Sequence, residues 1–278
     1  MQAAATMEPE TFQWLQSYIH RSFGIFLAEH KRTMLESRLR TVVARRGLPS
    51  FKAYIEHYLK GGATSDVLDE LVNVVSTNLT YFNREPIQYD LLRKALPGLA
   101  ERAEKRQGRK ELRAWCGAAS KGHEPYTLAM ILADHFGPAY GAWDAGLLAT
   151  DISDSALGIA RQGVYSHEET AALPERLRKR HMKQRADGKW EVSPSRKQEV
   201  VFRRFNLKNR LPFKRPFDFV FLRNVMIYFD NETRGDIATR IGKMLYPEGL
   251  LFIGLSESLP RNLPGLEAIG NSMYRRKR

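Results

Sequence analysis

The chain has 278 residues, 43% of them hydrophobic, which suffices for roughly two domains with a sizeable core and excludes a disordered protein. No apolar run reaches the roughly 20 residues of a membrane span and no export signal is visible, so we expect a cytosolic protein without membrane insertion, whose single Cys116 forms no internal disulfide. A formal net charge of +13 predicts an acidic partner, although charge alone does not choose among nucleic acid, an anionic membrane surface and an acidic protein.

The first 75 residues carry apolar side chains at helical spacing. This spacing predicts helices over residues 11–23, 31–46, 51–59 and about 65–75, with Ser50 as the cap of the third helix. We therefore expect a small helical domain of its own.

The second of these helices is strongly basic. Lys31, Arg38 and Arg45 recur every seven residues and form one stripe beside the apolar face, followed by Arg46. Such charges commonly belong to a solvated helix face, and the alternative is a docking surface for an acidic helix. Spacing alone leaves both open.

Residues 76–85, STNLTYFNRE, form a polar and aromatic connection to the rest of the chain. Their hydroxyl and amide side chains can bond backbone or ligand, and the rings of Tyr81 and Phe82 can attract a cation such as a sulfonium. The simpler interpretation is a linker that leads into a helix over residues 87–106.

Residues 112–134 predict a strand, a loop of small residues and a helix that begins near Glu124–Pro125, which is how α/β proteins build a nucleotide pocket. Lys and Ser/Thr do not follow Gly122, and three glycines in dinucleotide spacing are missing, so a phosphate cradle is not supported. Because Glu124 also disfavours phosphate, the segment fits a positively charged nucleoside such as S-adenosylmethionine, or else an ordinary strand–helix turn.

A second strand is expected over residues 146–150 and ends at Asp151. An acid at this place can bond ribose hydroxyls, or it can cap the helix expected over residues 154–162. The two roles are compatible.

Residues 175–215 contain fifteen Lys/Arg and only four acids, and they resemble an insertion with a hairpin turn at 186–189. A strand is predicted over 200–205 and ends at Asn206–Leu207. The continuous apolar run 217–222 is typical of a central parallel strand and ends at Arg223–Asn224. A helix over 232–245, a buried strand over 250–254, one edge strand near 268–274 and a solvated basic tail complete the prediction.

The loop 117–124 and the residues Asp151, Asn206 and Arg223–Asn224 all follow predicted strands. The carboxyl edge of an open α/β sheet is where ligands bind. At this point the chain resembles the CheR-type chemotaxis receptor methyltransferases. The resemblance covers residues 8–277 and rests on STNLTYFNRE (76–85), AASKGHEPYTLAM (118–130), ATDI (149–152), FDFVFLRNVMIYFD (217–230) and LFIGLSESL (251–259).

The resemblance implies an α/β fold: a doubly wound, Rossmann-like methyltransferase sheet with an all-helical N-terminal domain and a small β insertion. The corresponding expected boundaries are residues 1–75 for the helical receptor-docking domain, 76–90 for a linker, 91–278 for the methyltransferase domain and about 175–205 for the insertion. The implied activity is transfer of a methyl group from S-adenosylmethionine to glutamate side chains on the cytoplasmic helices of chemoreceptors, with S-adenosylhomocysteine as product.

Matching positions imply a set of site residues. The expected cofactor contacts are Asn78, Thr80, Arg84, Glu124, Asp151, Asn206, Leu207, Arg223 and Asn224. Arg84 and Tyr228 are expected to face the substrate glutamate and are the predicted catalytic residues. The basic stripe of Lys31, Arg38, Arg45 and Arg46 becomes the predicted docking surface for acidic receptor helices. No metal site is predicted, and a monomer is expected.

Four departures from the family pattern stand out. Asn83 replaces a second Phe, and Lys121 and His123 replace a Thr and a Glu or Gln. The side chains of Lys121 and His123 either alter cofactor affinity or simply face solvent. The short turn near 186–189 predicts an enzyme that does not use a receptor's C-terminal peptide tether.

Two rival functions remain open. A nucleic-acid methyltransferase would explain the basic run, but no Asn/Asp-Pro-Pro-aromatic motif is present and Cys116 lies inside a predicted strand, a poor place for a nucleophile. A non-catalytic module that senses the cofactor is the second rival, and the presence of Arg84, Glu124 and Asp151 speaks against it.

Overall fold

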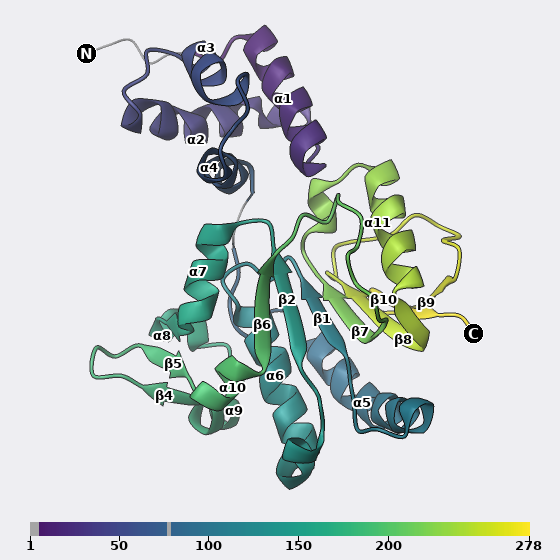
Figure 1. Ribbon diagram of the computed structural model, residues 1–278. Coiled ribbons are helices and arrows are strands. Elements are labelled where there is room, and N and C mark those ends of the chain that lie inside the picture. Colours follow the sequence, from purple (N-terminus) through teal and green to yellow (C-terminus); the bar gives the residue numbers. More distant parts are fainter. Residues whose placement is uncertain (1–5, 77–78) are drawn as a thin grey trace. The chain divides into compact units, whose positions relative to one another are not determined.

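The computed structural model describes residues 6–76 and 79–278, which form two compact units (Figure 1). The first unit contains the described residues up to 76 together with Tyr228–Asp230. The second contains Leu79–Ile227 and Asn231–Arg278. A short segment of the C-terminal half of the chain therefore belongs to the helical unit.

Four α-helices build the first unit, and they confirm the predicted positions. They are α1 (Pro9–Phe23), α2 (Arg32–Arg45), α3 (Phe51–Tyr54) and α4 (Ser65–Val75), with a 3-10 turn at Glu29–Lys31 and a π-helical segment at Ile55–Leu59. Ser50 caps α3 as predicted, because its Oγ accepts a hydrogen bond from the Ala53 N–H at 3.1 Å. Among the described helices of the chain, none has both the length and the apolar character needed to cross a bilayer.

A seven-stranded sheet forms the centre of the second unit, in the order β6-β2-β1-β7-β8-β10-β9. Its strands are β1 (Ala114–Gly117), β2 (Leu147–Asp151), β6 (Val200–Arg204), β7 (Phe217–Leu222), β8 (Leu245–Ile253), β9 (Leu266–Gly270) and β10 (Met273–Arg276). The first five strands in this order run parallel, and β10 is antiparallel to both of its neighbours.

The strand order reverses at β1, which pairs with β2 on one side and with β7 on the other. Such a reversal is the switch point at which open α/β sheets bind ligands, outside the carboxyl ends of the strands. The loop after Gly117 and the pair Arg223–Asn224 therefore start at neighbouring strand ends.

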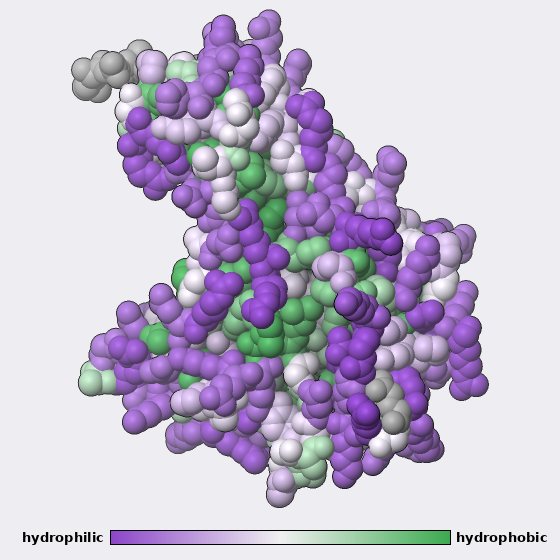
Figure 2. All heavy atoms as spheres, viewed as in Figure 1, coloured by the Kyte–Doolittle hydropathy of each residue, from purple (hydrophilic) through white to green (hydrophobic). Residues whose placement is uncertain are grey.

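The helices of this unit cover a sheet whose central strand is buried on both faces, since every residue of β7 is buried. The long helices are α5 (Pro86–Gln107), α6 (His123–Phe136), α7 (Asp154–Gln162) and α11 (Asn231–Lys243). Figure 2 shows hydrophilic side chains over most of the visible surface and an apolar area over β6, β2 and β1.

The β insertion is a small three-stranded sheet in the order β3-β5-β4. Its strands are β3 (Val164–Tyr165), β4 (Met182–Gln184) and β5 (Trp190–Val192), accompanied by α8 (His167–Thr170), α9 (Glu175–His181) and α10 (Pro194–Gln198). The small sheet thus begins before residue 175, the predicted start, while the predicted strand 200–205 belongs to the large sheet as β6. A compact turn over 185–189 joins β4 to β5, with the Arg185 N–H donating to the Lys189 carbonyl at 2.8 Å.

The C-terminal prediction of one edge strand is wrong, and the predicted solvated tail is confirmed only for Lys277 and Arg278. The segment forms a hairpin in which β9 is the edge and β10 lies between β9 and β8. Arg275 pairs with Glu267 at 2.7 Å, and Arg276 donates to the Lys243 carbonyl at 3.1 Å, so the first half of the tail is part of the sheet. Sequence periodicity missed this because both short strands are only partly buried.

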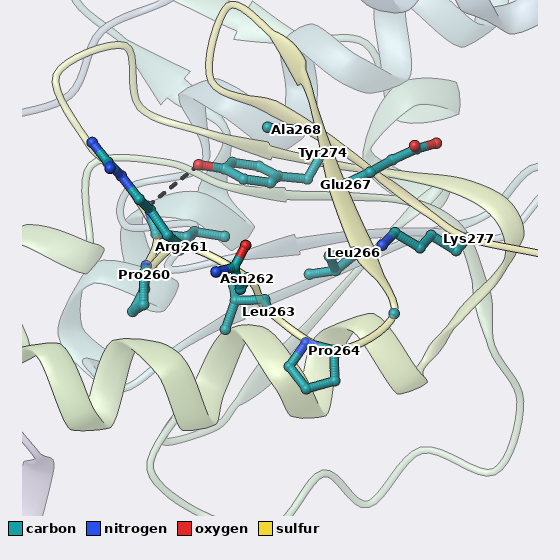
Figure 3. Close-up of a pocket in the computed structure, with 12 residues that line it drawn as sticks. Pro260, Arg261, Asn262, Leu263, Pro264, Leu266, Glu267, Ala268, Tyr274 and Lys277 are labelled. Atoms are coloured by element: carbon teal, nitrogen blue, oxygen red, sulfur yellow. Dashed lines mark hydrogen bonds between the residues drawn. The ribbon is translucent and has the colours of Figure 1, made fainter.

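A pocket of about 550 Å³ lies between this hairpin and the loop that precedes it (Figure 3). Its walls include Arg261, Tyr274 and Lys277, and none of the predicted site residues borders it. The predicted chemistry therefore lies elsewhere, at the strand ends.

Gly122 provides a test of how tightly the loop after β1 is packed. Its φ is +90°, and a Cβ at this residue would lie 2.8 Å from the Ala160 Cβ. We expect Gly122→Ala to lower the free energy of unfolding by about 2 kcal/mol, because the left-handed backbone and the clash both penalise a side chain. Urea unfolding measures the change.

Gly61→Ala is the matched control, since a Cβ at Gly61 would meet no atom within 4 Å and the backbone there is not left-handed. Equal stability of the two variants would contradict the packing described for this loop.

Candidate functional site

The loop between β1 and α6 has a strained backbone that is tied to the end of β2. Ala118 and Ser120 have φ values of +54° and +47°, a region that non-glycine residues rarely adopt. The Ala119 N–H donates to the Thr150 carbonyl at 2.9 Å, and the Ser120 N–H donates to Asp151 Oδ2 at 2.7 Å. Strain of this kind persists where surrounding contacts over-determine it, and it commonly marks a ligand site.

Asp151 lies at the end of β2, as predicted, and is 8% exposed. Its second oxygen, Oδ1, accepts from the Ser153 N–H at 2.9 Å. The alternative role as cap of α7 is wrong, because Ser153 is the cap and its Oγ accepts from the Ala156 N–H at 3.1 Å. Asp151 instead joins the two loops that follow β1 and β2.

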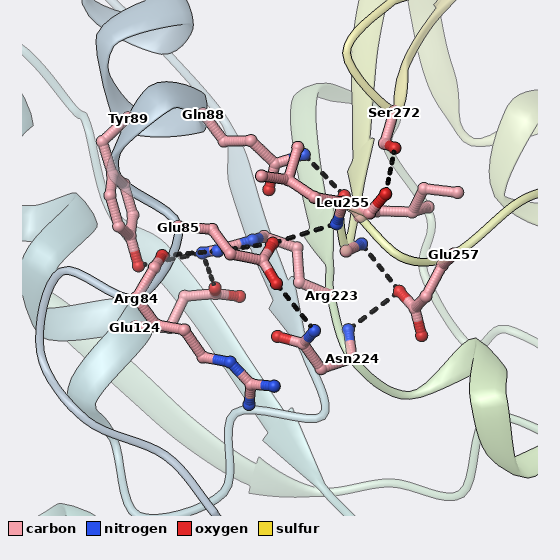
Figure 4. A network of polar contacts seen from close by, with 12 residues as sticks. Arg84, Glu85, Gln88, Tyr89, Glu124, Arg223, Asn224, Leu255, Glu257 and Ser272 are labelled. Atoms are coloured by element: carbon pink, nitrogen blue, oxygen red, sulfur yellow. Dashed lines mark hydrogen bonds and ion pairs between the residues drawn. The ribbon is translucent and has the colours of Figure 1, made fainter.

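Arg223 is the centre of a buried polar network at the end of β7 (Figure 4). Its guanidinium, 1% exposed, donates to Glu124 Oε2 at 2.5 Å and to Glu85 Oε2 at 3.1 Å. It also donates to the Tyr89 hydroxyl at 3.0 Å and to the Arg84 carbonyl at 2.5 Å. One side chain thus connects the segment before α5, the start of α6 and the end of β7.

The charges of this network leave a negative excess. Burial lowers the pKa of Arg223, but Glu124, Tyr89 and Glu85 raise it by more, so the guanidinium keeps its proton. Burial raises the pKa of Glu85, and hydrogen bonds from Asn224 and from the Leu255 N–H, together with Arg223, lower it below its usual value. Two carboxylates around one guanidinium leave one formal negative charge, which favours a cationic ligand nearby.

Glu85 and Glu257 are site residues that the sequence prediction missed. Glu85 Oε1 accepts from the Asn224 side-chain amide at 3.0 Å. Glu257 accepts from the backbone N–H groups of Gly254 at 2.6 Å, Asn224 at 2.8 Å and Ile227 at 3.2 Å. Both acids lie in segments that carry the family resemblance, 76–85 and 251–259, but the sequence gave no indication of their partners.

Asn224 has a φ of +57°, so the chain makes a left-handed turn immediately after β7. Glu257 stabilises this turn with the three N–H bonds just described. Burial raises the pKa of Glu257, and its backbone donors oppose that rise.

The predicted linker residues lie beside the network. Arg84 donates from Nη1 to the Leu79 carbonyl at 2.7 Å, and Figure 4 shows its guanidinium directed away from Arg223. Thr80 lies in the same segment and is half-buried. Asn78 falls outside the described residues.

Asn206 and Leu207 follow β6, and a residue that sequence analysis missed holds their loop. Arg240 of α11 donates to the Leu207 carbonyl at 2.9 Å and to the Asn209 carbonyl at 2.7 Å. Asn206 Oδ1 accepts from the Lys208 N–H at 3.0 Å. The sheet thus places Asn206, Asp151, the loop after Gly117 and Arg223 at the carboxyl ends of four adjacent strands.

Tyr228 belongs to the helical unit, where its carbonyl accepts from the Phe26 N–H at 2.7 Å. Arg84 belongs to the other unit, so the expectation that both face one substrate stays a prediction.

The predicted docking residues are partly engaged within the helical unit. Arg38 donates to the carbonyls of Val74 and Ser76, both at 3.0 Å, and Arg46 pairs with Glu70 at 2.9 Å. Arg45 pairs with the same Glu70 but is exposed, and Lys31 is half-buried.

His123 does not face solvent. It is fully buried at the start of α6, so that alternative is wrong for this residue, whereas Lys121 is half-buried. Cys116 is also fully buried, and burial followed by the nearby Glu124 raises the pKa of its thiol. A buried, protonated thiol is a poor nucleophile, which argues against pyrimidine carbon methylation.

Family comparisons agree with this geometry. The all-alpha domain of the CheR methyltransferases matches residues 10–76, and their S-adenosylmethionine-binding domain matches residues 78–274. The chain belongs to the CheR methyltransferase family. It is therefore an S-adenosylmethionine-dependent methyltransferase, as predicted.

Curated relatives of this CheR-family chain include three chemotaxis protein methyltransferases. The protein from Borreliella burgdorferi is 37% identical over 260 residues, 93% of this chain and 91% of the relative. The Escherichia coli protein is 39% identical, with 89% and 84% covered, and the Salmonella typhimurium protein is 37% identical, with 95% and 88% covered.

The residues at the strand ends fit S-adenosylmethionine. Asp151 places a carboxylate where ribose hydroxyls are bound in doubly wound folds. The excess negative charge around Arg223 suits a sulfonium, and the Ser120 Oγ is buried without a hydrogen-bond partner among the described residues. When bound, the cofactor supplies an activated methyl group, while the chain supplies its orientation.

Glu257→Gln tests whether Glu257 holds the left-handed turn at Asn224. An amide has one oxygen and presents N–H groups to backbone donors, so we expect a loss of about 2–3 kcal/mol in the free energy of unfolding. We also expect weaker binding of S-adenosylhomocysteine, because the Asn224 turn is no longer held. Urea unfolding and calorimetric titration measure the two effects.

Glu101→Gln, a change of an exposed acid on α5, is the control. Wild-type affinity and stability in Glu257→Gln would remove Glu257 from the site.

Proposed function

We propose that this methyltransferase transfers the methyl group of S-adenosylmethionine to glutamate side chains on the cytoplasmic helices of chemoreceptors, forming methyl esters. The observation that carries the proposal is the strand-end site described above in a chain of the CheR family, whose similar relatives are named chemotaxis protein methyltransferases. The net charge of +13 supports an acidic substrate.

The reaction needs positioning rather than a general base. A glutamate carboxylate has a reference pKa near 4.3 and is an anion at neutral pH. Its oxygen forms a bond to the methyl carbon while the carbon–sulfur bond breaks, and the bonding electron pair stays on sulfur in S-adenosylhomocysteine. Holding oxygen, carbon and sulfur in line is the contribution required of the protein.

We assign the orientation of the substrate carboxylate to Arg84, with Tyr228 donating a hydrogen bond or shaping the pocket. A guanidinium binds a carboxylate through two parallel N–H donors. The Arg84 backbone is fixed by Arg223, while its guanidinium is half-exposed and donates to the Leu79 backbone carbonyl. That arrangement suits a side chain that exchanges one acceptor for another.

Docking is proposed for the helical domain, residues 1–75, through α2. The described contacts refine this proposal, because Arg38 is bound to the end of α4 and Arg46 is partly covered by Glu70. The side chain of Arg45 is 64% exposed and is the best placed of the four to meet an acidic helix.

The activity is tested with radiolabelled S-adenosylmethionine and purified receptor cytoplasmic domains. The expected product is a methyl ester that releases methanol in alkali. Base-stable label in added RNA or DNA would favour the nucleic-acid rival, and cofactor binding without any transfer would favour a sensing module.

Arg84→Ala should lower kcat/KM for the receptor about 100-fold, because the carboxylate loses its orienting partner. The melting temperature should change little, since the Arg84 guanidinium makes a half-exposed contact. Arg93→Ala, which removes another exposed arginine of the same region, is the control. An unchanged methylation rate in Arg84→Ala would remove this residue from the mechanism.

Independence from a receptor tether is a further part of the proposal. The turn that joins β4 to β5 spans only residues 185–189, which leaves little loop to hold a peptide. Receptor domains with and without their C-terminal tails should be methylated at equal rates. Tight binding of isolated tail peptides would overturn this expectation.

A further inference from the structure

His123 lies in a buried cluster where three separate segments of the chain meet. Its ring centroid is 5.0 Å from that of Phe82 in the linker and 4.6 Å from that of Tyr165 in β3. The rings of Phe82 and Tyr165 are 4.9 Å apart in an edge-to-face arrangement. All three side chains are almost completely buried.

The β insertion holds the linker side of this cluster. The Phe82 N–H donates to the carbonyl of Glu169 in α8 at 3.2 Å, and the Asn83 side-chain amide donates to the Ala172 carbonyl at 3.0 Å. Glu169 also approaches His123, with 3.3 Å between Oε1 and Nε2. The linker that carries Thr80 and Arg84 is therefore anchored on α8 two residues before Arg84.

The loop between β1 and α6, residues 118–122, is called the cofactor loop here, and it contacts the other side of the cluster. The Tyr165 hydroxyl donates to the Lys121 carbonyl at 2.8 Å, and a Cβ at Gly122 would lie 2.9 Å from that hydroxyl. His123 itself follows Gly122 directly and begins α6. Its ring thus fills the space between the loop and the linker.

The ionisation of the cluster agrees with this packing role. Burial lowers the pKa of His123, and Glu169 opposes that decrease, so the net shift favours the neutral form of the imidazole. His123 in turn lowers the pKa of Glu169 to about 2. Lys121 and Tyr165 are the other ionisable groups that face the ring.

We propose that His123 is a positioning residue that sets the Arg84-bearing linker against the cofactor loop. Its removal leaves a cavity beside Phe82, and the linker loses the ring contact that joins it to α6. The proposal rests on the proposed function only for the role of Arg84, since the placement of the linker can be measured without methyl transfer.

Hydrogen exchange of the intact protein tests the proposal directly. In His123→Ala, we expect the amides of residues 80–85 to exchange about 10-fold faster than in the wild type, with Phe82 most affected. His123→Gln keeps much of the side-chain volume, so its exchange should stay closer to the wild type. His135→Ala is the matched control, because His135 is an exposed histidine on the same helix.

Kinetics separate positioning from a purely structural role. With saturating S-adenosylmethionine, kcat for methylation of the receptor should fall about 10-fold in His123→Ala. The KM for the cofactor, measured separately, should change much less. His123→Gln should recover most of the rate. A folded His123→Ala with wild-type exchange at residues 80–85 would overturn the proposal. So would a loss of thermal stability with kcat unchanged.

If His123→Ala does not fold, Phe82→Leu alters the same ring contact on the linker side. We then expect faster exchange at residues 119–123, and wild-type exchange there would count against the proposal. If wild-type protein methylates no receptor, the proposed function fails while the exchange result still decides the role of His123.

Discussion

The site depends on one buried ionic interaction, the guanidinium of Arg223 between Glu85 and Glu124. Removing an arginine from water is expensive, and it is tolerated here because two carboxylates, a hydroxyl and a carbonyl accept its hydrogen bonds. Removal of one partner from such a buried pair typically costs about 3–5 kcal/mol. The same contacts fix the start of α6 and the backbone of Arg84, so stability and site geometry depend on the same atoms.

Backbone strain accompanies this network. Ala118, Ser120, Asn224 and Glu85 all have positive φ values, and each lies where a strand ends or a helix begins at the switch point of the sheet. Hydrogen bonds that backbone N–H groups donate to Asp151 and Glu257 hold two of these turns in place. Strained loop conformations that surrounding contacts hold in this way are characteristic of ligand sites.

The large positive charge is less available than composition suggests. Arg223, Arg240 and Arg38 are occupied in holding loops and helix ends, so they contribute to the net charge of +13 while binding internal acceptors. A partner therefore meets the exposed cations such as Arg45 rather than the whole count.

Local patterns were sufficient to predict much of this protein. Apolar periodicity located the four N-terminal helices and α5, and the uninterrupted apolar run located β7 with the bounds observed. Because parallel strands end at a common edge, the order of strands and polar residues along the chain also placed Asp151, Asn206 and Arg223 at one edge. These predictions succeed since each depends on residues close together in the sequence.

Contacts between distant segments decided the rest. Glu257 acts through backbone N–H groups some 30 residues away, Ser153 rather than Asp151 caps α7, and His123 is buried because Phe82 and Tyr165 come from separate segments. The C-terminal hairpin depends on pairing with β8, which its own weak periodicity does not indicate. Sequence determined which elements form and which residues end them, whereas tertiary structure decided which acids bind backbone and that His123 is buried. The physical reason is that hydrogen bonds and packing across the chain leave no local periodicity to read.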